Sequence, residues 1–61
     1  MNIEIDFFDY KGKGVDSKTT TWPHYRTGDI IIHKTEEYSV SSIIVDEDNE
    51  VAIVRAFGSS K

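Results

Sequence analysis

The sequence predicts an all-β fold, a small antiparallel meander of about five strands curled into an SH3-like barrel or a strongly bent sheet. The first reason is composition: the 61 residues include eight isoleucines, five valines, five threonines and seven aromatic residues, but no leucine and no glutamine. β-branched and aromatic side chains fit a pleated, half-buried surface and lose rotamer freedom in a helix. The second reason is pattern, because short apolar stretches alternate with turn residues and no helical period appears. A chain of this length makes one domain, residues 1–61.

The first strand is expected over Ile3–Tyr10. From Ile3 to Phe7 every second residue is apolar, so these side chains share one face. Phe8 falls on the opposite side, which predicts either a bulge next to it or a second face that is covered at that end. Two glycines within residues 11–14 then mark a turn.

A second strand is expected over Val15–Trp22. It is polar and contains three consecutive threonines, which is typical of an exposed edge strand. Pro23 ends it, because proline has no backbone donor and restricts the residue before it. Residues 24–29 are then a connection that closes on a glycine turn.

The strongest strand signals lie in the second half of the chain, where strands are expected over residues 29–34, 38–45 and 50–57. The first of these contains three consecutive isoleucines, Ile30–Ile32, which predicts burial on both faces or a place near the middle of the sheet. The charged residues 46–49 are expected to form a hairpin loop. Residues 58–61 are expected to be a short flexible tail.

Composition also excludes several classes of protein. The chain has no cysteine, which rules out disulfides and thiolate metal sites, and His24 and His33 lack the spacing of paired ligands on a helix. We therefore expect no cofactor and no metal. The N-terminus shows no signal-peptide pattern, and no apolar run approaches the roughly twenty residues of a membrane span. We expect a soluble, cytoplasmic protein.

The charge is unevenly distributed along the chain. Residues 1–28 carry equal numbers of acidic and basic side chains, so the whole net charge of −4 arises in residues 29–61. An acidic protein repels phosphate backbones, which argues against general nucleic-acid binding.

The first candidate binding surface consists of Trp22, His24, Tyr25 and Arg26. Tryptophan and tyrosine are enriched at protein-binding hot spots, because a flat amphipathic ring offers a large contact area for little entropy lost. The alternative is that Trp22 plugs the open end of the small core. A half-buried ring can serve both purposes.

The second candidate is the acidic cluster Asp46, Glu47, Asp48 and Glu50. Carboxylates are the ligands that calcium and magnesium prefer, but the stretch lacks the twelve-residue loop and central glycine of an EF-hand. We therefore expect either a solvated turn that discourages aggregation, or an acidic face that imitates nucleic acid and occupies a partner's basic groove.

A third pattern supports an alternative function. Residues 10–28 hold a local excess of positive charge interleaved with aromatic rings, namely Lys11, Lys13, Lys18, Arg26, Trp22 and Tyr25. Lysines along the phosphates with aromatics stacked on the bases are the means by which small barrels bind single strands. The alternative hypothesis is a small barrel that binds single-stranded nucleic acid.

Catalysis has no motif to support it. The sequence contains no nucleophile elbow, phosphate loop or HExxH. A substrate pocket of about 300 Å³ or more would consume the core of so small a domain. We therefore expect a protein that is not an enzyme, in which His33 is a strand residue at the margin of the sheet.

The sequence thus predicts a non-catalytic domain that binds another protein. We expect the contact to use an exposed strand edge, the loop at residues 22–26 or the acidic second half. A small, acidic chain without chemical motifs is typical of adaptors and inhibitors encoded by viral or mobile-element reading frames. Self-assembly, as a homodimer or a larger structure, is a third hypothesis, and no membrane partner is expected.

Overall fold

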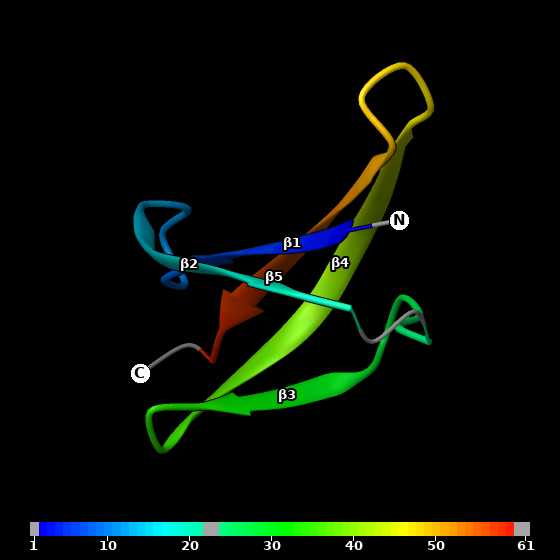
Figure 1. Cartoon of the computed structure of the whole chain (residues 1–61). Coiled ribbons are helices and arrows are strands. Elements are labelled where there is room, and N and C mark those ends of the chain that lie inside the picture. The colour runs from blue at the N-terminus through cyan, green and yellow to red at the C-terminus, as the bar shows by residue number, and fades with distance from the viewer. Residues whose placement is uncertain (1, 22–23, 60–61) are drawn as a thin grey trace.

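Strand β5 lies inside the sheet, and the other strands are arranged around it (Figure 1). The computed structural model describes residues 2–21 and 24–59. The strands are β1 (Asn2–Phe8), β2 (Gly14–Thr20), β3 (Ile30–His33), β4 (Glu36–Asp46) and β5 (Val51–Gly58), in the spatial order β2-β1-β5-β4-β3. The sheet curls through 209° into a half-barrel. The predicted all-β class with a strongly bent sheet of five strands is confirmed.

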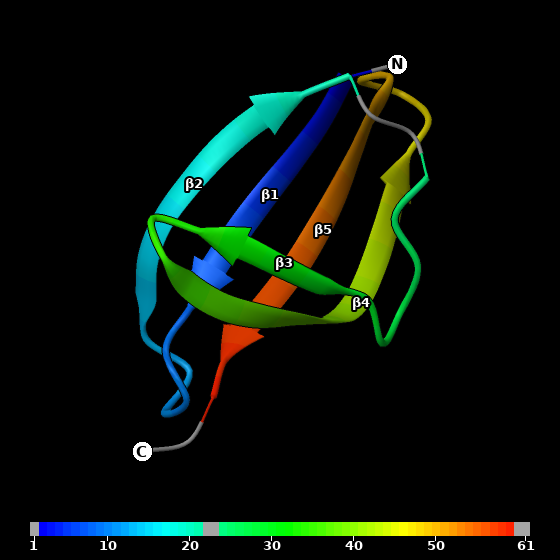
Figure 2. The same ribbon diagram turned by 90° about the horizontal axis from the view of Figure 1, so that it is seen from below.

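The sheet is mixed, which corrects the expectation of an antiparallel meander. β1 and β5 run parallel, whereas the other neighbouring strands are antiparallel. β2 and β3 follow one another in the chain but form the two edges. A meander needs a tight turn between them, whereas residues 21–29 separate them along the chain. Figure 2 shows the result, with β3 lying in front of β1 and β5.

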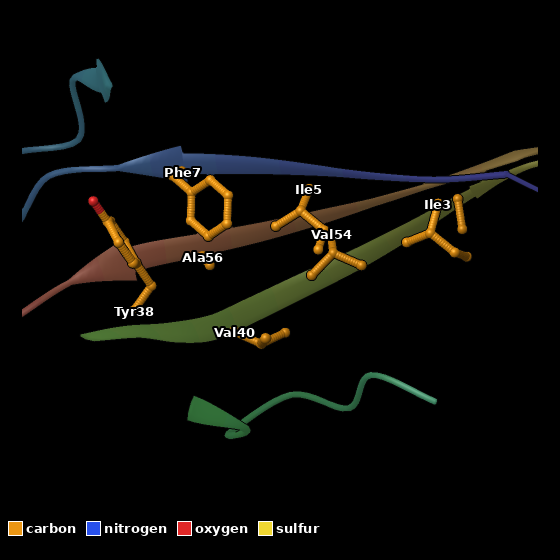
Figure 3. Packing of buried hydrophobic residues seen from close by; sticks show 8 residues of the cluster. Ile3, Ile5, Phe7, Tyr38, Val40, Val54 and Ala56 are labelled. Atoms are coloured by element: carbon orange, nitrogen blue, oxygen red, sulfur yellow. The ribbon is translucent and has the colours of Figure 1, made fainter. Parts of the chain in front are cut away.

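The core lies inside the curl of the sheet (Figure 3). Alternate residues of β1 and β5, together with the start of β4, are buried there: Ile3, Ile5, Phe7, Tyr38, Val40, Ala52, Val54 and Ala56. Three half-buried side chains, Tyr25, Ile31 and Ile43, pack against this cluster. The alternation predicted between Ile3 and Phe7 is therefore confirmed.

Phe8 lies on the opposite, convex face. Its ring stacks on that of Phe57, with the ring centroids 4.8 Å apart. The pairing of β1 with β2 is also irregular here, because the register shifts between Phe7 and Phe8. Both features suggested by the change of phase, an irregular pairing and a covered second face, are present.

The prediction that Ile30–Ile32 are buried, or lie near the middle of the sheet, is wrong. β3 is an edge strand, and Ile30 and Ile32 are 58% and 63% exposed. The apolar run that does occupy the interior of the sheet is Val51–Val54 of β5. β3 has room for four residues only, because Lys34 and Thr35 adopt positive φ values of 51° and 69° and turn the chain straight into β4.

The remaining local predictions agree with the structure in most places. The threonine-rich strand β2 is an edge strand, and residues 47–50 form the turn between β4 and β5. Gly58, which the sequence placed in a flexible tail, is the last residue of β5. Residues 60–61 of that tail lie outside the described residues.

Candidate functional site

The outer edge of β3 combines an open strand edge with exposed apolar side chains. β3 is the last strand of the sheet, so its second edge has no neighbouring strand among the described residues. Its exposed side chains, Ile30 and Ile32, are two of the most exposed large apolar residues that the structure describes. An exposed apolar edge strand is a ready template for pairing with another chain.

The backbone of β3 presents its hydrogen-bonding groups alternately to β4 and to the free edge. The amide of Val40 donates to the carbonyl of Asp29 at 2.8 Å, which fixes the phase of the antiparallel ladder. Because bonded and non-bonded pairs alternate along such a ladder, Ile31 directs its N–H and C=O towards β4. Ile30 and Ile32 direct theirs towards the free edge. Two donors and two acceptors are thus offered to an incoming strand.

One side chain, Asp16, links the two edges of the half-barrel. Its Oδ2 lies 2.7 Å from Nε2 of His33 and 3.1 Å from Nζ of Lys34. Asp16 belongs to β2 and His33 to β3, so this contact, which we call the Asp16 clasp, joins the first and last strands of the sheet. The His33 ring also stacks flat on Phe7, with the centroids 4.1 Å apart. The clasp therefore fixes the His33 end of β3 against the core.

The clasp makes stability depend on pH at the acid end. Hydrogen bonds from His33, and then from Lys34 and the Ser17 amide, hold the pKa of the Asp16 carboxyl well below its usual range. The folded state therefore binds fewer protons than the unfolded state just below pH 4. The stabilisation by the clasp is complete above the pKa of about 3.9 that an aspartate has in the unfolded chain. It is lost as the pH falls towards the lower pKa of Asp16 in the folded chain. We expect Asp16→Asn to lower the free energy of unfolding at neutral pH, with a deficit that shrinks as the pH falls below about 4.

Urea denaturation at a series of pH values measures this deficit. Glu47→Gln is the matched control, because it also removes one carboxylate but lies exposed in the β4–β5 turn. A deficit of Asp16→Asn that stays constant from neutral to acid pH would contradict the assignment of the effect to the ionised clasp.

An apolar hollow opens on the inner face of the sheet. It has a volume of about 490 Å³ and is lined by apolar side chains including Ile3, Ile43 and Val45. Its polar lining comes from Asn2, Thr21 and Tyr25. A hollow of this volume, which the sequence analysis expected to consume the core, coexists with it because a half-barrel leaves part of its inner face open.

The first predicted binding surface lies in the connection between β2 and β3. His24 and Arg26 are exposed, and the Arg26 amide donates to Oδ2 of Asp29 at 2.9 Å. Tyr25 is half-buried, packs against the core and lines the apolar hollow. Trp22, for which the sequence analysis considered a place at the open end of the core, lies outside the described residues.

The predicted acidic cluster divides into one structural residue and three exposed ones. Asp46 accepts hydrogen bonds from Nδ2 of Asn49 at 2.9 Å and from its backbone amide at 3.3 Å, and these bonds lower the pKa of the Asp46 carboxyl. Glu47, Asp48 and Glu50 are exposed on the turn. Within residues 2–21 and 24–59, no group of three or more acidic, histidine or cysteine side chains is placed to hold a metal ion.

The basic residues proposed for nucleic-acid binding are distributed over separate parts of the fold. Lys11 and Lys13 lie in the turn after β1, where their amides both donate to Oδ1 of Asp9 at 2.9 Å. Arg26 lies in the connection before β3, and Figures 1 and 2 show these two loops apart from each other. Lys18 lies between them on β2. The structure does not gather them around one aromatic platform among the described residues.

The sequence analysis expected an exposed strand edge as a contact surface, but it did not identify β3 as that edge, and it did not recognise the clasp. One usable signal was present: His33 lies two residues after Ile31, so both side chains must share a face, and a polar ring on the inner face needs a polar partner. The partner, Asp16, lies 17 residues away in the chain. No short sequence pattern therefore indicates that the side chains of Asp16 and His33 are in contact.

Among the described residues there is no helix long and apolar enough to cross a membrane. Comparisons of the chain with protein-family models, with curated proteins and with solved structures gave no match.

Proposed function

We propose that this protein is a non-catalytic binding domain that takes up an extended segment of a partner protein along the free edge of β3. The observation that carries the proposal is the coincidence of two features on β3. The backbone groups of Ile30 and Ile32 point outwards, and the side chains of the same residues are exposed. In strand addition, the main-chain hydrogen bonds supply affinity and the alternate side chains supply specificity.

The other edge of the sheet is less suited to strand addition. β2 carries mostly polar residues, and Lys18 lies near its middle. Lysine on an edge strand discourages pairing with another chain, because the incoming strand would have to desolvate or avoid the charge. The short, apolar β3 has no such residue between Ile30 and Ile32.

The chemistry of the edge defines the class of partner. A strand added beside β3 places alternate side chains next to Ile30 and Ile32 on the convex face. Apolar, β-branched or aromatic side chains at every second position would bury these isoleucines. We therefore expect an extended, alternating apolar segment, of the kind that is disordered or lies at an edge in the partner before binding.

A library of extended peptides displayed on phage tests this function. We expect the selected peptides, once synthesised, to slow the exchange of the Ile30 and Ile32 amide hydrogens with solvent, because each becomes hydrogen-bonded. Ile32→Lys should weaken binding by about tenfold or more, since it places a charge where the partner's apolar side chain packs.

Ile44→Lys is the matched control for this experiment. Ile44 is also exposed, at 43%, but it lies on β4, between β3 and β5 rather than at the edge. Binding should survive this change. Peptides that protect only amides in the 24–29 connection or the 47–50 turn would contradict the proposal and move the contact to one of the surfaces predicted from the sequence.

A further inference from the structure

The outward-facing backbone N–H and C=O groups of β3 complement each other when two copies of the strand lie side by side in antiparallel orientation. We propose that the partner strand is β3 of a second copy of this chain, with the two-fold axis of the dimer passing beside Ile31. The proposal rests on the proposed function, strand addition at this edge, and names the occupant. It predicts a continuous ten-stranded sheet across the dimer.

Backbone geometry selects the register. With Ile31 opposite Ile31, Ile30 of one copy lies opposite Ile32 of the other, and both residues direct their N–H and C=O towards the junction. Each such pair exchanges two hydrogen bonds, so the two symmetric pairs make four. If one strand shifts by one residue, residues whose N–H and C=O point outwards lie opposite residues whose groups point towards β4. If it shifts by two, only one pair of outward-facing isoleucines remains opposed. A single register satisfies all the outward groups of Ile30 and Ile32.

The same register buries the exposed side chains of the edge. Ile30 and Ile32 of both copies come to lie side by side on the convex face, as directly opposed pairs. β-branched residues in such cross-strand pairs stabilise a sheet. Four side chains that are each more than half exposed in the single chain thereby cover one another.

Charge favours the antiparallel direction. β3 is preceded by Asp29 and ends with His33, followed by Lys34. The antiparallel pairing places the Asp29 residues of the two copies at opposite ends of the junction, whereas a parallel pairing in register would set these two carboxylates side by side. These charges therefore discriminate against the wrong orientation.

The acidic turn at residues 47–50, which holds three of the eleven acidic side chains, lies far from this contact. β3 pairs with residues 36–39 of β4, whereas the acidic turn begins after Asp46 at the far end of that strand. Seven residues of strand span about 23 Å. Because the screening length is about 8 Å at physiological ionic strength, the acidic turns of the two copies scarcely repel each other.

The dimer should be weak and reversible. Strands of four residues bury far less than the roughly 1,600 Å² of a standard interface. We therefore expect a dissociation constant on the order of 100 µM. Sedimentation equilibrium over a concentration series around that value should show a monomer–dimer equilibrium. Ile32→Pro should raise the dissociation constant about tenfold or more, because it removes two of the four bonds.

Ile32→Pro leaves the hairpin intact, since the amide it removes points away from β4. Its circular dichroism spectrum and urea midpoint check this directly. Val15→Lys is the control on the opposite edge strand: Val15 is 50% exposed on β2, and the variant should dimerise like the natural chain.

Single cysteines test the register, because the chain contains no cysteine of its own. Ile31→Cys should form an intermolecular disulfide under mild oxidation, since a non-bonded antiparallel pair has Cα atoms about 4.5 Å apart, within disulfide range. Ile30→Cys and Ile32→Cys should each cross-link poorly alone, because identical residues lie more than about 7 Å apart in this register. An equimolar mixture of these two variants should form the mixed disulfide.

The outcomes separate this proposal from the proposed function. A monomer at every concentration overturns the dimer. The proposed function, strand addition, is then tested by the peptide experiment alone. A dimer that Val15→Lys dissociates and Ile32→Pro does not uses the β2 edge, and overturns it too. Efficient cross-linking of Ile32→Cys alone overturns the register. A concentration-dependent dimer, sensitive to Ile32→Pro and cross-linked by Ile31→Cys, supports the proposal.

Discussion

Phe7→Ala is expected to lower the free energy of unfolding by about 3–5 kcal/mol. Phe7 is completely buried, and its ring contacts two others, 4.1 Å from His33 and 4.7 Å from Tyr38 by ring centroid. Removing it leaves a cavity under His33 as well as losing the transfer free energy of the ring. A core in a chain of this length rarely supplies more than about 3–5 kcal/mol, so much of the population should unfold.

Urea denaturation followed by circular dichroism measures the loss. Phe57→Ala is the control, because Phe57 is an aromatic residue of the same size that stacks on Phe8 on the convex face and is only half-buried. We expect its cost to be less than half that of Phe7→Ala. Equal costs would mean that the convex face is as well packed as the concave one, against the burial described above.

Ile53→Pro is expected to destabilise the fold by about 3 kcal/mol or more. β5 has a neighbour on each side, so the amide of Ile53 bonds within the sheet, and proline removes that donor. The abandoned carbonyl costs about 1–3 kcal/mol, and the ring forces φ to about −65° within a strand. Loss of the dichroism of the sheet is the readout.

Ile32→Pro is the matched control for Ile53→Pro, because Ile32 lies on an edge strand and Ile53 lies inside the sheet. The same substitution at an edge amide should keep the protein folded, with a change within about 1 kcal/mol. If both prolines unfold the chain, the Ile32 amide is not free, and the assignment of β3 as an edge with outward-facing groups is wrong.

The protein-binding function and its competitors, nucleic-acid binding and self-assembly into larger structures, stay predictions that these experiments address. The structure changes where the first of them should be tested. One of the three surfaces expected from the sequence was an exposed strand edge. In the structure this edge is β3, with outward-facing backbone N–H and C=O groups and two exposed isoleucine side chains. The 24–26 connection contributes a half-buried Tyr25, and the acidic turn contributes three exposed carboxylates.

Local chemistry was sufficient to predict the strands themselves. The alternation from Ile3 to Phe7 places a core face on β1, because successive side chains of a strand point to opposite sides. The threonines of β2 indicate an edge, and the charged residues before Glu50 indicate a turn. Each of these patterns depends on residues only a few positions apart, and such residues are also close together in space.

The neighbours of each strand were decided by the tertiary structure. Ile30–Ile32 and Val51–Val54 are similar apolar runs, yet one forms an edge and the other lies inside the sheet. Strand alternation specifies which side of a strand is apolar, but the covering of both sides depends on the path of the rest of the chain. In this fold β2 and β3, consecutive in the chain, form opposite edges of the half-barrel, which leaves β3 with an open edge and brings Asp16 to His33. The strands could therefore be predicted from the sequence, whereas the open edge of β3 exists only because distant segments pack in this order.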